Sequence, residues 1–394
     1  MAVIGRDDGK FVDNAKYFFL QGASLLAPCA RVVFVTERDD VAGMLAGTDY
    51  EVLVYPSFRS VWFLLCAAVV VVDSSEWVWR LRRFLLIGAK KVQLWHGVGY
   101  KRIELDRWRH EAQGNRILTA ALMPSLRKFM NALSGRFVRY DAFNTTSEFY
   151  RKEVFEPAFS SRHFIVSGYP RNSFGDVDET VRSLAWKNVD PTVAAAVPGW
   201  RDEGRRIVLV APTYRESRAT PMGLTPEAVA SLDAYCEAEG VEFLFKFHPY
   251  EIGTAEVSGK HLHLCSPDSD FYPLMPLSSA LITDYSSIYM DYLLLDNPVL
   301  FLVPDLDVYV HKDRRTQFDF NEMTPGPKVE NWADLLSELR GQWRHDSYRE
   351  AREKMKKLAF DDLPQNDAVP KLIAFMRAER WLPENIEFRF PPSP

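Results

Sequence analysis

AAVVVVD (residues 67–73), SEWVWRLRRFLLIG (75–88) and KVQLW (91–95) follow one another in the chain, and together they decide the fold. The first and third runs are continuously apolar, which is typical of parallel strands that are covered on both faces. The run between them has the length of a helix. A strand, a helix and a second strand in this order predict a βαβ unit.

The same alternation extends in both directions and falls into two blocks. Further apolar runs predict strands at residues 31–36, 51–55, 206–213, 241–249, 260–265, 279–284 and 298–305. A polar, proline-bearing stretch at residues 175–205 separates the blocks. We therefore expect an α/β protein with two Rossmann-like, doubly wound domains, at residues 1–175 and 176–394, that face each other across a cleft.

Composition narrows the class of protein. The chain has 394 residues and a formal net charge of -5, so the molecule as a whole offers no electrostatic attraction to nucleic acid. Its four cysteines are scattered without a metal-like spacing and predict buried, reduced thiols. The first residues lack the pattern of a signal peptide, and the most apolar run, residues 61–72, is too short to span a bilayer. We expect a cytoplasmic protein.

Polar side chains follow several predicted strands at their carboxyl ends, where open α/β sheets bind ligands. They are His96 after KVQLW, Arg215 after VLVAPTY, His248 after FLFKF, and Asp284, Tyr285, Ser286 and Ser287 after SALIT. Because such ends share one edge of a sheet, these side chains are the candidates for a functional site.

His96 has two interpretations. Gly97 and Gly99 allow positive φ and a close approach of a ligand to the backbone, and Lys101 can reach back over the same loop. An imidazole with a pKa of about 6.5 can take a proton from a hydroxyl at neutral pH. A lone histidine in a turn is more often structural, so the catalytic hypothesis depends on the second histidine and the cations.

The remaining groups suggest a phosphate ligand. Lys246 and His248 lie two residues apart on a strand, and an ammonium beside an imidazole is costly to bury unless an anion faces the pair. Arg215 suits a bidentate phosphate contact, although a solvated surface cation is the simpler interpretation. Ser286 and Ser287 precede a helical run, and they either cap it or bind an anion with its free N–H groups.

Several motifs in order resemble the CDP-glycerol glycerophosphotransferase family, the CDP-polyol phosphotransferases of teichoic-acid and capsule synthesis. They are DNAKYFF (13–19), WHG with a lysine five residues after the histidine (95–101), GYPRN (168–172), APTYR (211–215), KFHP (246–249), TDYSS (283–287) and PDLDVYVHKDR (304–314). The sequence departs from the family pattern at Ser173, usually acidic, and at Val98 and Gly99, usually threonine and proline. Both departures concern the acceptor or the polyol.

The resemblance implies a GT-B architecture in which the first domain is the acceptor side and the second binds the CDP donor. It implies transfer of a polyol phosphate, chiefly glycerol phosphate, to an acceptor hydroxyl with release of CMP and with no cofactor. The acceptor would be a polymer or a lipid-linked saccharide. His96 would be the general base, and His248 would contact the donor pyrophosphate. Arg215, Lys246, Asp284, Tyr285, Ser286 and Ser287 would lie near the donor. Lys101, Arg171 and Arg314 are candidates for contact with the acceptor or for a role in the loops of the site.

Some alternatives stay open. The Asp-x-Asp pairs at residues 176–178 and 305–307 suit a divalent metal, but we expect none, and we expect Asp284 to orient loop backbone or a cytidine group. The basic, amphipathic segment at residues 107–140 either packs on the sheet or lies on an anionic membrane surface, which would make the protein peripheral on the inner face of the membrane. A GT-B nucleotide-sugar glycosyltransferase or epimerase, or a non-catalytic scaffold, would use the same fold.

Overall fold

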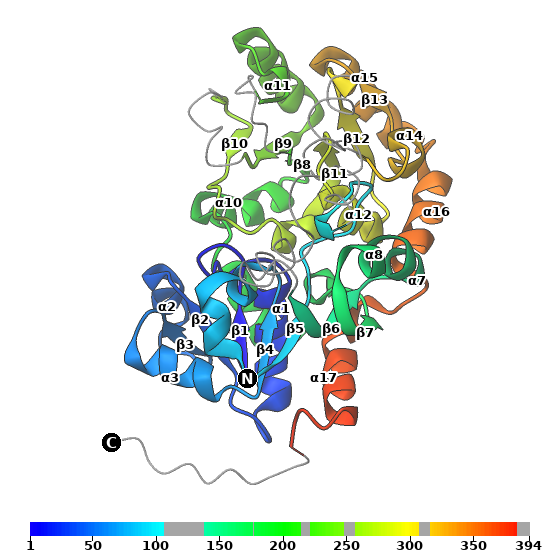
Figure 1. The fold of residues 1–394 in the computed structure, drawn as a ribbon. Coiled ribbons are helices and arrows are strands. Elements are labelled where there is room, and N and C mark those ends of the chain that lie inside the picture. The colour runs from blue at the N-terminus through cyan, green and yellow to red at the C-terminus, as the bar shows by residue number, and fades with distance from the viewer. Residues whose placement is uncertain (106–137, 176, 214–220, 248–256, 307–315, 384–394) are drawn as a thin grey trace, which may run out of the picture. The chain divides into compact units, whose positions relative to one another are not determined.

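The computed structural model describes residues 1–105, 138–175, 177–213, 221–247, 257–306 and 316–383. The chain forms two compact units (Figure 1). Unit 1 consists of residues 1–96, 103–187 and 360–394, and unit 2 consists of residues 97–102 and 188–359. Within the described ranges, no helix combines the length and the apolar character that crossing a membrane requires.

Unit 1 is built on a seven-stranded parallel sheet with the order β3-β2-β1-β4-β5-β6-β7. The strands are β1 (Ala2–Ile4), β2 (Val33–Thr36), β3 (Glu51–Val54), β4 (Val69–Val72), β5 (Lys90–Gln93), β6 (Arg139–Thr145) and β7 (Ser160–Val166). Every residue of β1, β2 and β4 is buried, as continuous apolar runs predict. The apolar pattern of the sequence does not predict β1, which is only three residues long, or β6 and β7, whose sequences mix polar and apolar residues.

Helices cover both faces of this sheet. α1 (Asp13–Leu26) packs with α9 (Glu179–Trp186) and α17 (Ala368–Ala378), whereas α3 (Phe58–Cys66) packs with η2 (Arg80–Leu86). Right-handed crossovers place α1 and α3 on opposite faces, because α1 leads from β1 outward to β2 and α3 leads back from β3 to β4. The remaining elements are α2 (Asp39–Leu45), η1 (Glu76–Val78), α7 (Glu148–Tyr150), η3 (Arg151–Phe155), α8 (Glu156–Ala158), η4 (Pro170–Asn172) and η9 (Gln365–Asp367).

The helix predicted at residues 75–88 is not an α-helix. The structure has two 3₁₀-helices there, η1 and η2, separated by Trp79 in an extended conformation with φ -113° and ψ 164°. Trp77 is buried, and the guanidinium of Arg82 lies 4.5 Å from the centre of its ring. Burial of this indole sets a local turn that the length of the segment alone does not reveal.

Unit 2 contains a six-stranded parallel sheet with the order β10-β9-β8-β11-β12-β13. Its strands are β8 (Arg206–Val210), β9 (Val241–Phe245), β10 (Leu262–Leu264), β11 (Ser278–Thr283), β12 (Val299–Leu302) and β13 (Lys328–Val329). Its helices are α10 (Pro191–Asp202), η5 (Pro221–Gly223), α11 (Pro226–Glu239), η6 (Tyr272–Leu277), α12 (Ile288–Tyr292), η7 (Leu293–Leu295), α14 (Phe320–Met323), α15 (Trp332–Arg344) and α16 (Arg349–Phe360). The predicted class, two doubly wound parallel α/β domains, is therefore confirmed.

The unit boundaries differ from the predicted domain limits of 1–175 and 176–394. The structure divides the chain after Lys187 and returns residues 360–394 to unit 1. The reason lies in α1, against which α9 and α17 both pack. Lys16 of α1 is fully buried, and its ammonium donates a hydrogen bond to the carbonyl of Ala185 in α9 at 2.7 Å. A domain boundary predicted from a polar stretch of sequence does not take such a contact into account.

The surroundings of Gly326, which packs against β12, and of Gly199, in α10, predict opposite effects when each glycine is replaced by alanine. A Cβ atom at Gly326 would lie 2.0 Å from the carbonyl oxygen of Val299, whereas one at Gly199, in α10, would have no atom within 4 Å. We expect Gly326→Ala to destabilise the protein by about 1–3 kcal/mol through overpacking. Gly199→Ala should stabilise it by up to about 1 kcal/mol, because alanine favours helix. Urea denaturation followed by circular dichroism measures both, and equal stability of the two variants would contradict the described packing.

Candidate functional site

The turn after β5 carries His96 on an unusual backbone. Trp95, directly before it, has φ +59°, and Gly97, directly after it, has φ +152°. A left-handed conformation is rare for a bulky aromatic residue and costs roughly 1–3 kcal/mol, and it persists only where the surrounding structure enforces it. The groups that hold this turn are therefore part of the site.

Three side chains hold the turn by hydrogen bonds. Gln93 Oε1 accepts a bond from the N–H of Trp95 at 2.8 Å, and Asn14 Nδ2 donates to the carbonyl of Trp95 at 2.8 Å. Arg171 Nη1 donates to the carbonyl of His96 at 2.9 Å. The N–H of Arg171 also donates to Asn14 Oδ1 at 3.2 Å. Side chains of the DNAKYFF and GYPRN motifs thus bind the carbonyls of the strained residue, Trp95, and of His96 after it.

A buried ion pair supports these contacts. The guanidinium of Arg171 donates a hydrogen bond to the carboxylate of Asp13, and the two residues are only 3% and 5% exposed. A second guanidinium, that of Arg6, lies 3.6 Å from the same carboxylate. Burial alone would raise the pKa of Asp13, but Arg171 and Arg6 overcome it and hold this pKa below its ordinary value. Asp13 also has φ +63°, a second left-handed residue at this site.

Asp73, which follows β4, fixes the orientation of the imidazole. Its carbonyl oxygen lies 3.3 Å from Nδ1 of His96. A carbonyl can only accept, so this contact places the imidazole hydrogen on Nδ1 and leaves Nε2 free to accept a proton. The carboxyl of Asp73 accepts a bond from the N–H of Ala15 at 3.3 Å. Burial and the negative charge of Asp13 raise the pKa of Asp73 well above its ordinary value.

The imidazole of His96 is neutral at physiological pH. The residue is open to solvent on one side, and on the other its ring packs on Trp95 with a centroid separation of 4.1 Å. The surrounding protein lowers the pKa of His96 to about 4, Asp13 opposes the shift, and Arg6 adds to it. The ring is therefore ready to accept a proton, although it is a weaker base than the ordinary pKa of about 6.5 predicts.

Asp284 and Tyr285 lie inside unit 2. Asp284 is fully buried, and its Oδ1 accepts hydrogen bonds from the N–H groups of Thr213 at 2.6 Å and Tyr285 at 2.5 Å. It therefore orients loop backbone, one of the two roles expected for it. The hydroxyl of Tyr285, also fully buried, donates to Asp305 Oδ1 at 3.0 Å. Its side chain is part of the internal packing of this loop.

Ser286 and Ser287 are half-buried beside α12. The helical run expected after them is present, as the five-residue α-helix α12 that continues as the 3₁₀-helix η7. Ser287 occupies the N-cap position without a side-chain capping bond, so the capping interpretation is wrong for it. A Cβ atom at Gly99 would lie 3.3 Å from Cβ of Ser287, so glycine at this position provides space, whereas at Gly97 it provides positive φ.

The residues that follow His96 in the chain belong to unit 2. The carbonyl of Tyr100 accepts bonds from the N–H groups of Gln317 at 2.7 Å and Phe318 at 3.2 Å. Lys101 forms an isolated antiparallel bridge with Thr316. Lys246 is also engaged, since its ammonium donates to the carbonyl of Ser269. The bridge fixes the backbone of Lys101, and the hydrogen bond fixes the ammonium end of the Lys246 side chain.

Other predicted groups lie elsewhere. Arg171 bonds Asp13 and the carbonyl of His96, so its side chain supports the turn, in line with the loop role expected for it. Arg215, His248, Arg314 and residues 107–137 lie outside the described residues, as does one aspartate of each Asp-x-Asp pair. Among the described residues, no group of three His, Cys, Asp or Glu side chains is arranged to hold a metal ion.

Five residues of the His96 network were missed as site residues in the sequence. They are Arg6, Asp13, Asn14, Asp73 and Gln93. Two of them stand in the DNAKYFF motif, which was recognised only as a family segment. Asp73 ends the most apolar strand of the chain, and a carboxyl at that position was a signal available from the sequence.

The surroundings of His96 predict its titration. We expect NMR of histidine-labelled protein, assigned with His96→Gln, to show a neutral imidazole down to about pH 4, as the lowered pKa implies. Asp13→Asn should lower this pKa further, because the carboxylate favours the charged ring. Since the folded pKa lies below the unfolded value of about 6.5, the wild type should lose stability relative to His96→Gln as pH falls from about 6.5 to 4. Titration near 6.5 would contradict the described surroundings.

The ion pair predicts a strong dependence on Arg171. Arg171→Met leaves Asp13 buried with one fewer cation and should destabilise the protein by about 3–5 kcal/mol. The double variant Asp13→Asn/Arg171→Met should lose less than the sum of the single variants. Arg182→Met is the control, because its exposed pair with Glu179 in α9 contributes at most about 1 kcal/mol. Additive losses in urea denaturation would show that the two side chains do not interact.

Comparison with known proteins assigns the chain to a family. A teichoic acid poly(glycerol phosphate) polymerase of Bacillus subtilis (strain 168) is 27% identical over 260 residues, 63% of this chain but only 32% of the polymerase, so the chain spans about a third of that relative. A teichoic acid glycerol-phosphate transferase of Staphylococcus aureus (strain NCTC 8325 / PS 47) is 24% identical over 332 residues, 79% of each chain.

The fold has a counterpart among solved structures. The wall teichoic acid polymerase TagF, in a crystal soaked with CDPG, superposes with a TM-score of 0.69 at 20% identity, over 96% of this chain and 88% of that one. The two parallel α/β sheets of unit 1 and unit 2 match this GT-B-like fold. The sequence profile of one family matches residues 4–368 of the chain. The protein therefore belongs to the CDP-Glycerol:Poly(glycerophosphate) glycerophosphotransferase family.

Proposed function

We propose that this protein transfers a polyol phosphate, in the first instance glycerol phosphate, from a CDP-activated donor to an acceptor hydroxyl with release of CMP. The observation that carries the proposal is the family match over residues 4–368, which includes the strained turn at His96. The acceptor is a growing teichoic-acid or capsular polymer, or a lipid-linked saccharide. The protein acts in the cytoplasm, at the inner face of the membrane.

His96 is the general base in this proposal. Its Nε2 takes the proton of the acceptor hydroxyl, and the acceptor oxygen forms a bond to the phosphorus that carries the polyol. The bond from that phosphorus to the bridging oxygen of the pyrophosphate breaks, and CMP leaves with the oxygen. The hydrogen bond from Nδ1 to the carbonyl of Asp73 keeps the ring in the tautomer that this step requires. The negative charge of Asp13, which favours the protonated ring, stabilises the imidazolium that forms.

The donor side is assigned to unit 2. Phosphoryl transfer needs alignment of the reacting groups and neutralisation of charge more than covalent help from the protein. We assign donor contacts to Arg215, Lys246, His248 and the hydroxyls of Ser286 and Ser287. Asp284 and Tyr285 shape the same loop from inside. Lys101 and Arg314 remain the candidates for acceptor contacts.

A panel of activated donors tests the reaction class. The full-length chain is incubated with CDP-glycerol, CDP-ribitol and UDP-N-acetylglucosamine, each with a polyol-phosphate oligomer as acceptor, and the released nucleotide is identified by chromatography. We expect CMP from a CDP-alcohol and no UDP. Release of UDP with sugar transfer, or epimerisation of the sugar nucleotide, would replace the proposal with the nucleotide-sugar alternative.

Replacing each of the two histidines should change the kinetics of transfer in a different way. His96→Ala should lower kcat by about 10²–10⁴ with little change in donor affinity, because the acceptor hydroxyl then keeps its proton. His248→Ala should weaken donor binding as well as kcat, because a partner of the pyrophosphate is lost. Donor affinity by calorimetry and single-turnover rates separate the two effects. His163→Ala, in β7, is the matched control and should keep wild-type kinetics. Wild-type turnover by His96→Ala would make that histidine a turn residue only.

A further inference from the structure

Arg6 lies at the carboxyl edge of the unit 1 sheet, shortly after β1. β1 pairs with β4, and β4 pairs with β5, so the ends of these three strands lie side by side. Asp73 follows β4, and His96 lies in the turn after β5. The loop after β1 is a tight turn, because the carbonyl of Arg6 accepts hydrogen bonds from the N–H groups of Gly9 and Lys10, both at 3.1 Å. The fold therefore holds Arg6 next to the strand ends of the His96 site.

The guanidinium of Arg6 has no hydrogen-bond acceptor within the described ranges. Its Nε is shielded from solvent and makes no hydrogen bond. Its Nη1 lies 3.6 Å from Asp13 Oδ2, which is an ion pair but is too long for a hydrogen bond. The side chain is 41% exposed, so a ligand can reach it. Arg171 differs, because it donates to both Asp13 and the carbonyl of His96.

The charges around Arg6 leave a surplus of positive charge. Arg6 and Arg171 contribute two guanidinium groups, and Asp13 contributes one carboxylate, whose pKa they lower. Burial and the charge of Asp13 raise the pKa of Asp73 well above its ordinary value, which favours the neutral form of this acid. His96 is neutral as well. Two cations against one anion leave one positive charge, and it lies at the half-exposed guanidinium of Arg6.

Two further acids near Arg6 do not balance this charge. Asp7 is paired with Lys10, whose Nζ lies 3.1 Å from its Oδ2. Glu76 forms no ion pair with Arg6 in the part of the chain that the structure describes, and burial, followed by the charge of Asp7, raises its pKa. An external anion is therefore the partner that the guanidinium of Arg6 lacks.

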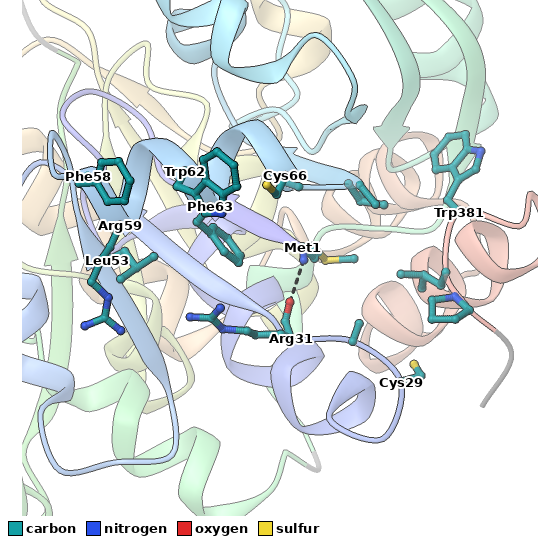
Figure 2. A pocket seen from close by; sticks show the side chains of 16 residues that line it. Met1, Cys29, Arg31, Leu53, Phe58, Arg59, Trp62, Phe63, Cys66 and Trp381 are labelled. Atoms are coloured by element: carbon teal, nitrogen blue, oxygen red, sulfur yellow. Dashed lines mark hydrogen bonds between the residues drawn. The ribbon is translucent and has the colours of Figure 1, made fainter. Parts of the chain in front are cut away.

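The apolar pocket of unit 1 is a poorer site for such an anion (Figure 2). It has a volume of about 520 Å³ and is lined by Met1, before β1, and by Val69, the first residue of β4. It therefore lies at the amino ends of the strands, the edge opposite to Arg6. Arg31, which also lines it, donates two hydrogen bonds to the carboxylate of Glu51, one of them at 2.7 Å. A guanidinium that is already paired in this way has less to offer an anion.

The chemistry of the proposed transfer indicates which anion Arg6 binds. Guanidinium groups bind phosphate through charge-assisted hydrogen bonds. The donor pyrophosphate is assigned to unit 2, whereas the acceptor hydroxyl approaches Nε2 of His96. A growing polyol phosphate chain carries a phosphodiester one polyol unit away from its terminal hydroxyl. A phosphate at Arg6 therefore belongs to the acceptor.

We propose that Arg6 binds the phosphodiester nearest to the reacting hydroxyl, so that the protein selects acceptors that end in a polyol phosphate. The proposal rests on the proposed function and names the chemical class of its acceptor. Arg6 lies 3.6 Å from Asp13, Asp13 bonds Arg171, and Arg171 bonds the carbonyl of His96. One network therefore holds both the phosphate and the base that takes the proton.

Calorimetry without a donor tests this subsite apart from turnover. The ligands are a trimer of glycerol phosphate and triglycerol, which has the same terminal hydroxyls but ether oxygens in place of the phosphates. We expect the full-length wild type to bind the glycerol phosphate trimer about tenfold or more tightly than triglycerol, and Arg6→Gln to lose this preference. Arg6→Lys should recover part of it, because lysine keeps the charge without the planar fork.

Arg38→Gln is the matched control for this experiment. Arg38 follows β2 at the same edge of the sheet, and its guanidinium already donates to both carboxylate oxygens of Asp40, at 3.0 and 2.9 Å. Its replacement should leave the preference for the glycerol phosphate trimer unchanged. Circular dichroism confirms that each variant is folded.

Initial rates of CMP release from CDP-glycerol separate acceptor binding from a supporting role. Arg6→Gln should raise KM for the glycerol phosphate trimer about tenfold or more, with kcat, KM for triglycerol and donor affinity little changed. An arginine that only supports His96 through Asp13 would instead lower kcat for both acceptors equally.

Three results would overturn the proposal. The first is a wild type that binds the glycerol phosphate trimer no better than triglycerol or than Arg6→Gln does. The second is an equal loss of activity with both acceptors, which would make Arg6 a support for His96 only. The third is a loss of CDP-glycerol affinity in Arg6→Gln, which would place the bound phosphate in the donor. Binding of the trimer through Arg6 without CMP release from any CDP-alcohol would support the subsite and contradict the proposed transfer.

Discussion

The ion pair between Asp13 and Arg171 is the constraint on which the His96 site depends. Trp95 adopts a left-handed backbone that a tryptophan does not keep by itself, and the groups that hold its carbonyl and that of His96 come from Asn14 and Arg171. Arg171 can lie in the interior only because Asp13 neutralises it, and Asp13 ionises there only because of its guanidinium partners. The same carboxylate acts on the imidazole, whose pKa it raises against the effect of the surrounding protein. One buried pair therefore sets the position of His96 and moderates its basicity.

The WHG motif ends one unit and begins the other. His96 is the last residue of unit 1 before residues 97–102, which pack in unit 2 through the carbonyl of Tyr100. The side chain of the proposed base is thus fixed by α1, η4 and β5, while the backbone a few residues later is fixed by residues of unit 2 near Ser287. Gly97 and Gly99 serve this arrangement differently. The first adopts a positive φ, and the second leaves room for Ser287.

Much of the architecture was predictable, because a parallel strand that is buried on both faces appears in the sequence as a continuous run of apolar residues. Residues 67–73 and 206–213 are continuous apolar runs, and each became a central strand. The site was predictable only in part. His96 could be recognised because it directly follows a predicted strand. Asp13 and Asn14 lie at the start of α1, and the sequence of that helix reads mainly as an apolar helical segment. Their importance comes from a contact with Arg171 more than 150 residues away, and separation in sequence hides such pairs. The prediction of a helix at residues 75–88 was wrong for a similar reason. The burial of Trp77 depends on residues elsewhere in the chain, which the local sequence does not show.

The apolar residues of unit 1 divide into two populations that sequence patterns cannot tell apart. Those of β1, β2 and β4 are buried and complete the interior of the sheet. Those on the outer side of α3 and η2 contribute little to that interior, since they remain in water while Leu64 and Leu86 of the same elements are buried. Large exposed apolar side chains that lie close together mark an interaction surface. The exposure seen in the structure, not the sequence pattern, therefore separates core residues from candidates for binding.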